Sequence, residues 1–209
     1  MGKVSVIVTT FNRPNLLKDT IKSILSQTYR NFELIIVDNK SEYDFFNLIK
    51  SFKDSRIKAF QNENNGIIAV NRNYGINKST GKYIAFCDDD DLWLENKLET
   101  QLDQIEKKFN INSNFLVYTN TILFGKDIAH KKTKKKQIKR FEDFFQTNNI
   151  TLSSVLLTKS DKVMFDIDPA KKASEDFDLW INLFLSKYTL LLLEDPLVKY
   201  RIISNSAFR

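Results

Sequence analysis

The first half of the chain alternates short apolar runs with segments in which apolar residues recur every three or four positions. A short continuous apolar run is typical of a strand that is covered on both faces, and the recurrence is typical of an amphipathic helix. Turn residues such as Pro14 and Gly66 separate these segments. The pattern predicts strands over residues 4–9, 34–37, 57–60 and 83–87, and helices over residues 14–25, 44–52 and 67–77 between them.

The second half of the chain is less regular. Strands are predicted over residues 115–119, 121–124, 152–157, 189–193 and 198–203, and a helix over residues 175–186. The apolar side of that helix carries Phe177, Trp180, Ile181, Phe184 and Leu185. Residues 126–140 are polar and very basic, which indicates a surface loop. No repeat or linker separates two units, so we expect a single domain over residues 1–209.

Alternating strands and helices predict an α/β fold with a mainly parallel sheet. Ligands of such sheets bind outside the carboxyl ends of the strands. Three of the predicted strands end in polar or charged residues, which are Thr9-Thr10, Asp38-Asn39 and Asp88 to Asp91. This convergence predicts a ligand site at one edge of the sheet.

Composition narrows the class of protein. With 42% apolar and 28% charged residues the chain is typical of a globular protein, and its net charge of +6 favours acidic partners such as nucleotides, anionic membranes or acidic glycans. The single cysteine, Cys87, excludes an internal disulfide and is expected to be a buried strand residue. No apolar stretch approaches the ~20 residues of a membrane span. We therefore expect a cytoplasmic enzyme that can contact the inner face of a membrane without crossing it.

The consecutive carboxylates Asp88 to Asp91 follow a predicted buried strand and precede Leu92-Trp93. Adjacent carboxylates repel one another, so holding them at a strand end is unfavourable unless a cation or hydrogen-bond donors compensate. Mg²⁺ and Mn²⁺ suit this role, because such an ion is commonly bound by one or two carboxylates together with phosphate oxygens of a substrate. A solvated acidic turn that caps the next helix is the alternative. We favour the metal site, because the flanking apolar residues oppose exposure of the whole run.

Further polar residues have two interpretations each. Asp38 is placed to accept hydrogen bonds from a uracil or ribose edge, but it also suits an Asx turn. Arg13 and Arg72 can meet a base or a phosphate, or they are ordinary surface arginines. Glu175-Asp176 opens a predicted helix, where the helix dipole stabilises acidic residues. One of these two carboxylates can instead act as a general base.

The basic segment from His130 to Arg140 has no aromatic residue among its lysines, so we do not predict nucleic-acid binding. Attraction to anionic lipid, at about 1 kcal/mol per basic residue, is the functional alternative to a solvated loop. His130 is the only histidine of the chain, and a zinc site would need more such ligands.

A series of segments in fixed order carries a resemblance to a known family. The segments are Val4 to Arg13, Ser26 to Glu33, Val37 to Ser41, Asn65-Gly66 with Asn71 to Asn73, Gly81 to Asp91, Ser174 to Trp180 and Tyr200 to Ser206. Together they resemble the family 2 glycosyltransferases, and the resemblance covers nearly the whole chain. It implies a GT-A fold, with a Rossmann-like, mainly parallel central sheet flanked by helices and a small antiparallel portion on the acceptor side. It divides the domain into a nucleotide-sugar-binding half, about residues 1–110, and an acceptor-binding half, about residues 111–209.

The resemblance implies a role for each matching position. Asp90 would ligate Mn²⁺ or Mg²⁺, and Asp176 would be the catalytic base. Asp88 and Asp89 would face the ribose and diphosphate of the donor. The residues that would line the nucleotide pocket are Thr9, Phe11, Arg13, Asp38 and Arg72. Two positions depart from the family pattern, because Asn39-Lys40 replaces the commoner Asp-Gly and Asn71 stands where a small residue is usual.

The activity that the resemblance implies is metal-dependent hexosyl transfer from a nucleotide diphosphate donor, with a UDP-sugar favoured, to an acceptor hydroxyl with inversion. Asp176 would take the proton of that hydroxyl. The expected acceptor is a glycan or a lipid-linked glycan in polysaccharide assembly, bound near residues 126–140. Three alternatives stay open: a sugar nucleotidyltransferase, for which no Gly-rich phosphate loop is present, a non-catalytic module that binds anionic glycan or lipid, and a degenerate transferase that only hydrolyses its donor.

Overall fold

The computed structural model describes residues 2–108, 113–125, 128–145 and 150–203. These residues form one mixed sheet with strand order β3-β2-β1-β4-β8-β6-β9-β5, and β7 pairs with β6. The strands are β1 (Val4–Thr10), β2 (Phe32–Asp38), β3 (Ile57–Gln61), β4 (Tyr83–Asp88), β5 (Leu92–Trp93), β6 (Phe115–Gly125), β7 (Ile128–Lys132), β8 (Leu156–Thr158) and β9 (Thr189–Arg201). The helices are α1 (Pro14–Leu25), α2 (Phe45–Lys50), α3 (Ile68–Lys78), α4 (Lys97–Lys108) and α5 (Glu175–Leu185), with short 3₁₀ helices η1 (Phe141–Phe145), η2 (Leu152–Ser154) and η3 (Pro169–Lys171).

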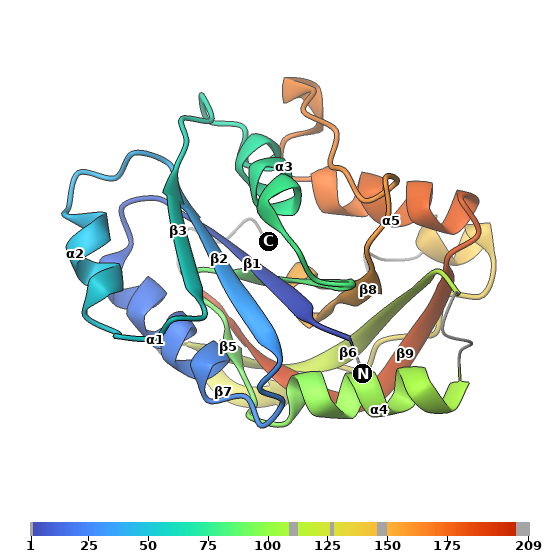
Figure 1. Cartoon of the computed structure of the whole chain (residues 1–209). Helices are drawn as coiled ribbons and strands as arrows, with labels where there is room; N and C mark the ends of the chain where they lie inside the picture. Colours follow the sequence, from blue (N-terminus) through green and yellow to red (C-terminus); the bar gives the residue numbers. More distant parts are fainter. Residues whose placement is uncertain (1, 109–112, 126–127, 146–149, 204–209) are drawn as a thin grey trace.

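The strands β3, β2, β1 and β4 run parallel to one another. Helices cover both faces of this sheet, with α1, α2 and α4 packed on one face and α3 and α5 on the other (Figure 1). Burial from both sides explains why every residue of β1 and β2 is buried. The predicted α/β architecture with a mainly parallel sheet is confirmed, whereas α4 and the two-residue β5 have no counterpart among the predicted elements.

The strand register brings the polar strand ends together. Thr10 on β1 lies opposite Asp38 on β2, and Thr9 lies opposite Asp88 on β4. The polar residues that end the three strands therefore meet at one edge, as the sequence predicts. Close packing of α3 fixes one side of this edge. A Cβ on Gly75 would lie 2.6 Å from Ile7 Cγ2, so a side chain there would push α3 away from β1.

Apart from the neighbouring strands β6 and β7, the second half of the sheet pairs strands that are distant in sequence. β6 runs parallel to β9 and antiparallel to β8 and β7, and β8 runs antiparallel to β4. The prediction of two strands within residues 115–124 is wrong, because β6 is continuous there, and β9 likewise unites two predicted strands. Asn120 and Pro196, which interrupt the apolar pattern, face each other where the β6–β9 register shifts. These register shifts accommodate Asn120 and Pro196 without ending either strand.

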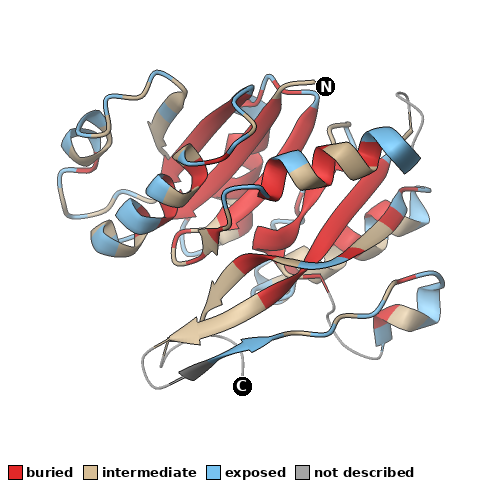
Figure 2. Ribbon diagram, turned by 90° about the horizontal axis from the view of Figure 1, so that it is seen from below, coloured by how far each residue is buried: buried red, intermediate tan, exposed pale blue. Residues whose placement is uncertain are grey.

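Two further predictions for this half are corrected by the structure. Residues 152–157 form η2 followed by β8 rather than one strand. The Ser154 hydroxyl donates to the Thr151 carbonyl at 2.7 Å, and such local bonds compete with strand pairing. The predicted loop 126–140 contains β7, which lies at an exposed edge of the sheet (Figure 2).

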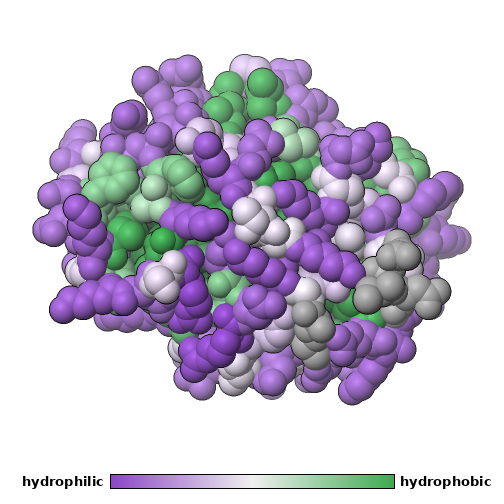
Figure 3. Space-filling model, in the orientation of Figure 1, coloured by the Kyte–Doolittle hydropathy of each residue, from purple (hydrophilic) through white to green (hydrophobic). Residues whose placement is uncertain are grey.

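The helix α5 buries most of the predicted apolar side, together with two leucines that the prediction did not include. Leu179, Trp180 and Leu183 are buried, whereas Leu185 is 57% exposed. Phe177, Ile181 and Phe184 of the predicted apolar side are partly buried against the second core cluster, and Leu179 and Leu183 join Trp180 within it. None of the helices in the described part of the chain has the length and apolar character needed to cross a membrane. The surface seen in Figure 3 is largely hydrophilic, with separate apolar patches.

Candidate functional site

The carboxyl edge of the parallel strands holds a hydrogen-bonded group of carboxylates. Thr10 Oγ1 donates to Asp89 Oδ2 at 2.7 Å. The guanidinium of Arg13, the residue before α1, donates to Asp89 Oδ1 at 3.2 Å and to Asp90 Oδ2 at 3.1 Å. The structure thus joins the end of β1, the start of α1 and the loop after β4 into one polar site.

A cavity of about 490 Å³ opens at this edge. Its walls include Thr9, Phe11, Arg13 and Asp89, all of which the sequence predicts for the nucleotide site. The volume falls within the range of small-molecule sites, about 300–1,000 Å³. Phe11 is 50% exposed, so the edge offers a flat apolar ring beside charged groups.

Five further polar residues of the cavity wall are absent from the predicted site: Thr10, Asn39, Asn64, Asn71 and Lys172. The Asn64 backbone N–H donates to Asn39 Oδ1 at 2.9 Å, which ties the turn after β2 to the loop before α3. Asn71 is buried and exchanges hydrogen bonds with Asn62 at 2.8 and 3.0 Å. The sequence signal for Asn64 and Asn71 is the polar cluster around Gly66, and the signal for Asn39 is the polar end of the second strand, whereas nothing in the sequence pattern singles out Lys172.

Asp38 is fully buried behind the cavity rather than open to it. Its carboxylate accepts hydrogen bonds from the backbone N–H and the hydroxyl of Ser41, and from Gln61 Nε2 at 2.9 Å. The Asx-turn interpretation is therefore realised in the structure. Because these donors engage both carboxylate oxygens, Asp38 acts here by holding the turn that presents Asn39 to the cavity.

The acidic run divides into one structural residue and three residues of the site. Asp91 is buried and accepts hydrogen bonds from Ser153 Oγ at 2.5 Å and from the Arg201 backbone N–H at 2.9 Å. It therefore links the loop after β4 to η2 and β9. The side chains of Asp88, Asp89 and Asp90 are 31%, 8% and 16% exposed and face the site instead.

The electrostatics of the three site carboxylates fit a divalent cation. Burial raises the pKa of Asp89 to about 6, and burial and the negative charge of Asp88 raise the pKa of Asp90. Added positive charge would relieve both effects. Among the described residues no three His, Cys, Asp or Glu side chains are grouped as a metal site, so a cation would rest on one or two carboxylates and on ligand oxygens. Mg²⁺ is commonly held in this way, and Asp88 and Asp90 supply suitable oxygens.

Arg72 is not among the described residues that line the cavity. Its guanidinium donates to Glu175 Oε1 at 2.6 Å and to Asp88 Oδ1 at 3.2 Å. Only 7% of the Arg72 side chain and 9% of the Glu175 side chain are exposed, so the two form a buried ion pair. Arg72 Nε and Glu175 Oε2 are buried and have no hydrogen-bond partner among the residues that the structure describes. The pair joins α3 to the start of α5. Because Arg72 also contacts Asp88, it holds Glu175 and its neighbour Asp176 close to the acidic run.

Asp176 lies in the first turn of α5, where its Oδ1 accepts a hydrogen bond from the Phe177 backbone N–H at 2.7 Å. Burial raises the pKa of Asp176, and the positive charge of Arg72 partly offsets this rise. A carboxylate with a raised pKa is a stronger base. Tyr200 of β9 lies near the acidic run and Asp176. Burial raises the pKa of Tyr200, and the negative charges of these carboxylates, with Asp91 first, raise it further.

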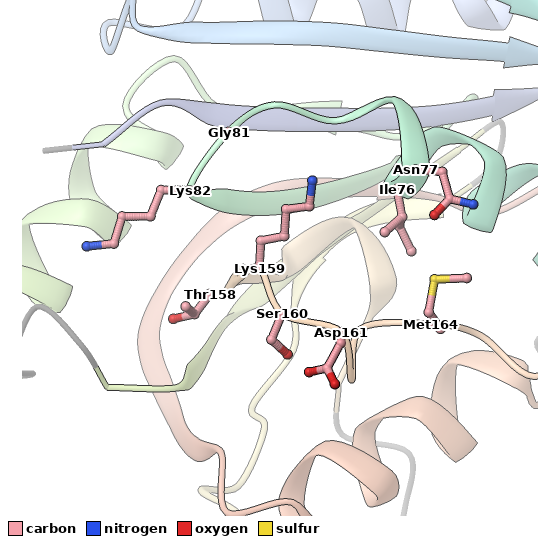
Figure 4. A pocket seen from close by; sticks show the side chains of 9 residues that line it. All are labelled: Ile76, Asn77, Gly81, Lys82, Thr158, Lys159, Ser160, Asp161 and Met164. Carbon is pink, nitrogen blue, oxygen red and sulfur yellow. The ribbon is translucent and has the colours of Figure 1, made fainter.

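A larger cavity of about 850 Å³ lies at the opposite, amino-terminal end of β4. The end of α3, the turn before β4 and the segment after β8 form its walls (Figure 4). Lys159 donates to the Ser79 carbonyl at 2.6 Å, and the Ser160 hydroxyl shares a hydrogen bond with the Tyr188 hydroxyl. These polar groups already bond within the protein and lie at the other end of the strand from Asp88, so the smaller cavity is the candidate functional site.

A comparison with known families decides the class of the protein. The model of the family described as Glycosyl transferase family 2 matches residues 5–161, a range that contains the strand ends, the amide cluster and the acidic run. The chain belongs to glycosyl transferase family 2. Its prediction as a glycosyltransferase from the ordered sequence segments is thereby confirmed.

Relatives in other organisms share this assignment. The uncharacterized glycosyltransferase MJ1057 of Methanocaldococcus jannaschii is 33% identical over 205 residues, which are 95% of this chain and 70% of MJ1057. The β-1,3-glucosyltransferase WfaP of Escherichia coli is 32% identical over 189 residues, which are 90% of this chain and 72% of WfaP. Other relatives are much longer, and the chain spans 26% of a Rickettsia bellii glycosyltransferase to which it is 37% identical.

Solved structures confirm the fold. The crystal structure of TarS from S. aureus has a TM-score of 0.76 at 18% identity, covering 96% of this chain and 37% of TarS. The mannosyltransferase PcManGT from Pyrobaculum calidifontis has a TM-score of 0.72 at 16% identity, covering 98% of this chain and 58% of PcManGT. The predicted GT-A fold, with a mostly parallel sheet and some antiparallel strands, is confirmed by this likeness.

Proposed function

We propose that this glycosyltransferase moves a hexose from a UDP-sugar to a hydroxyl of a lipid-linked or polysaccharide acceptor, with inversion at the anomeric carbon. The observation that carries the proposal is a cavity of nucleotide size that ends at the site carboxylates, with the Arg72–Glu175 pair holding Asp176 beside them. The names of two relatives support the donor, since WfaP and WfgD of Escherichia coli are UDP-Glc:alpha-D-GlcNAc-diphosphoundecaprenol β-1,3-glucosyltransferases at 32% and 33% identity.

The donor is proposed to lie along the cavity wall. Phe11 would pack against the base, and the amides of Asn39 and Asn64 would pair with polar edges of the base or ribose. Arg13 and Lys172 would face the diphosphate, because both are cationic residues of the cavity wall and Arg13 contacts Asp89 and Asp90 of the acidic run. About residues 1–110 would thus form most of the donor half, and Lys172 would close it from the second half.

Asp176 is proposed as the general base. It would take the proton of the acceptor hydroxyl while that oxygen forms a bond to the anomeric carbon and the bond to the diphosphate oxygen breaks, so that UDP leaves. The raised pKa of Asp176 favours proton transfer, and Arg72 keeps the carboxylate anionic before the transfer. The acceptor would approach from the half formed by about residues 111–209, where Tyr200 lies near the carboxylates.

Asp88 and Asp90 are proposed to hold Mn²⁺ or Mg²⁺. When bound, this ion would neutralise negative charge on the diphosphate. Arg13, which pairs with Asp89 and Asp90 in the structure, would then turn to the phosphate oxygens. The mannosyltransferase PcManGT was solved with GDP-Man and Mn²⁺, which agrees with this assignment at the level of the shared fold.

Calorimetric titration of UDP, with GDP and CMP for comparison and with and without Mn²⁺, tests the proposal. We expect metal-dependent binding of UDP that is lost in Asp90→Ala and kept in Asp161→Ala, a matched change in the wall of the larger cavity. Preference for another nucleotide would keep the enzyme class and change the donor. Absence of any nucleotide binding by the folded protein would contradict the proposed site, and pyrophosphate release from a nucleoside triphosphate would favour a nucleotidyltransferase.

A further inference from the structure

The basic segment that follows β7 is held against the body of the protein. The Lys135 backbone N–H donates to Asn120 Oδ1 at 2.7 Å, and Lys135 Nζ donates to Thr151 Oγ1 at 2.6 Å. The Gln137 side chain both donates to and accepts from the backbone of β9, at 2.7 Å in each case. Lys135 and Gln137 therefore face inward, which fixes the path of the segment beside β6 and β9.

The inward bonds leave alternate side chains on the outside. Successive side chains of an extended segment point to opposite sides, and Lys134 and Lys136 are exposed while Lys135 and Gln137 are half-buried. The exposed cations form a basic row on an anchored backbone at the sheet edge shown in Figure 2. The basic row consists of Lys131, Lys132, Lys134, Lys136, Lys139 and Arg140.

Two exposed phenyl rings follow the basic row directly. In η1, the rings of Phe141 and Phe145 meet edge to face with centroids 5.2 Å apart, and the residues are 38% and 70% exposed. Phe144 of the same turn is buried, with its ring centroid 6.0 Å from that of Phe177 and 5.5 Å from that of Phe184 on α5. The buried ring anchors η1 to α5 and leaves the other two rings in solvent.

We propose that the basic row together with Phe141 and Phe145 is a docking surface for an anionic lipid membrane. From Lys131 to Phe145 the sequence holds seven basic residues and two acidic ones, so the surface is strongly cationic. Anionic lipid attracts such clusters, and apolar rings gain when they leave water for the headgroup region. Because the segment and η1 are already ordered, little conformational freedom is lost when they bind.

The arrangement of the rings favours a membrane over a nucleic acid. Single-stranded nucleic acids are bound by aromatic rings that alternate with cations along a groove, so that successive bases can stack. Here the phenyl rings lie together at one end of the basic row and contact each other edge to face. A paired apolar tip beside a row of cations suits insertion at the surface of a bilayer.

The docking surface adjoins the proposed acceptor side of the site. η1 packs on α5, and α5 carries Asp176 in its first turn. Docking would therefore bring the second half of the protein close to lipid-linked molecules. The inference goes beyond the proposed function, since docking needs neither nucleotide nor transfer.

Vesicle sedimentation tests the inference. We expect the full chain to bind vesicles of phosphatidylglycerol and phosphatidylcholine, to ignore vesicles of phosphatidylcholine alone, and to bind more weakly at high salt. Phe141→Ser with Phe145→Ser should weaken binding at least about tenfold. Lys134→Gln with Lys136→Gln and Lys139→Gln should weaken it about a hundredfold, at about fivefold for each charge.

Matched variants elsewhere on the surface control for ring loss and net charge. Phe46→Ser removes a ring that is 44% exposed on α2, and a triple change of Lys18, Lys50 and Lys53 to Gln removes the same charge. Both should bind vesicles as the unchanged protein does. Equal weakening by the control triple, or no binding of anionic vesicles by the unchanged chain, would overturn the inference. UDP titration of each variant separates this outcome from a failure of the donor site.

Discussion

The two halves of the sheet are built in different ways. From β1 to β4 the chain repeats one local unit of strand and helix, and neighbouring strands run parallel. From β5 onward, apart from the neighbouring pair β6 and β7, strands pair with partners far away in sequence. Buried polar contacts, such as Asp91 with Ser153, join this half to the first. The first half thus forms the proposed nucleotide-binding edge from local strand–helix units, while the second half depends on particular long-range contacts to bring Asp176 to that edge.

Breaking the Arg72–Glu175 pair should disturb the junction of the halves most. Arg72→Met leaves the buried Glu175 carboxylate without its cation, and we expect a loss of about 3–5 kcal/mol in the free energy of unfolding. Denaturant unfolding measures this loss. Arg72→Met combined with Glu175→Met should recover much of it, because no charge then stays buried alone. A loss below about 1 kcal/mol in the single variant would show that the pair does not join the halves.

The second prediction separates two neighbours in the acidic run. Asp91→Ala leaves the Ser153 hydroxyl and the Arg201 N–H without their acceptor, so unfolding should become easier by about 2–4 kcal/mol. Asp90→Ala removes a partly exposed carboxylate that Asp88 repels, and stability should stay within about 0.5 kcal/mol. Thermal and denaturant unfolding of the two variants compare them. Equal losses would contradict the division into structural and site residues.

The third prediction has the smallest expected effect and concerns how the free energy of unfolding depends on pH. It rests on Glu33, which lies on β2 in the first half of the sheet. Burial raises the pKa of Glu33, but hydrogen bonds from Lys58, Ser5, Thr80 and Lys3 outweigh burial and hold this pKa well below its usual range. Since the folded pKa is depressed, the contribution to stability is present above the unfolded value of about 4.5 and is lost as pH falls below it. Glu33→Gln should therefore reduce the loss of unfolding free energy between pH 6 and pH 3 by about 1–2 kcal/mol. An unchanged pH slope in that variant would count against this account.

The contrast between local and long-range strand pairing also determines how much of the fold can be predicted from the sequence. In the first half, each element is marked by local periodicity and by turn residues, so strands and helices are found within a few positions. In the second half, Asn120 and Pro196 interrupt apolar runs that the folded sheet continues. Whether a strand survives a polar residue depends on its partner strand, which local patterns do not specify.

The candidate site is also only partly predictable from the sequence, because local patterns do not specify which side chains meet. Thr9, Phe11, Arg13 and Asp89 line the cavity, and the family resemblance of the sequence places all four at the donor site. Asp38 and Arg72 lie at the same edge, but their side chains are engaged by Ser41 and Glu175 in the structure. Such pairing depends on which groups meet in three dimensions, and the same is true of Lys172, which reaches the cavity from a segment more than 70 residues beyond the acidic run.

The most direct test of the central claim compares transfer and donor binding in Asp176→Asn. UDP release from UDP-glucose, with a GlcNAc-diphosphoundecaprenol acceptor such as WfaP's name specifies, gives the transfer rate, and calorimetry gives the affinity for UDP. We predict a rate about 10²–10⁴-fold below that of the unchanged protein, because the base is lost, with UDP affinity unchanged. Transfer by Asp176→Asn at the unchanged rate would contradict the claim that the Arg72–Glu175 junction positions Asp176 as the base.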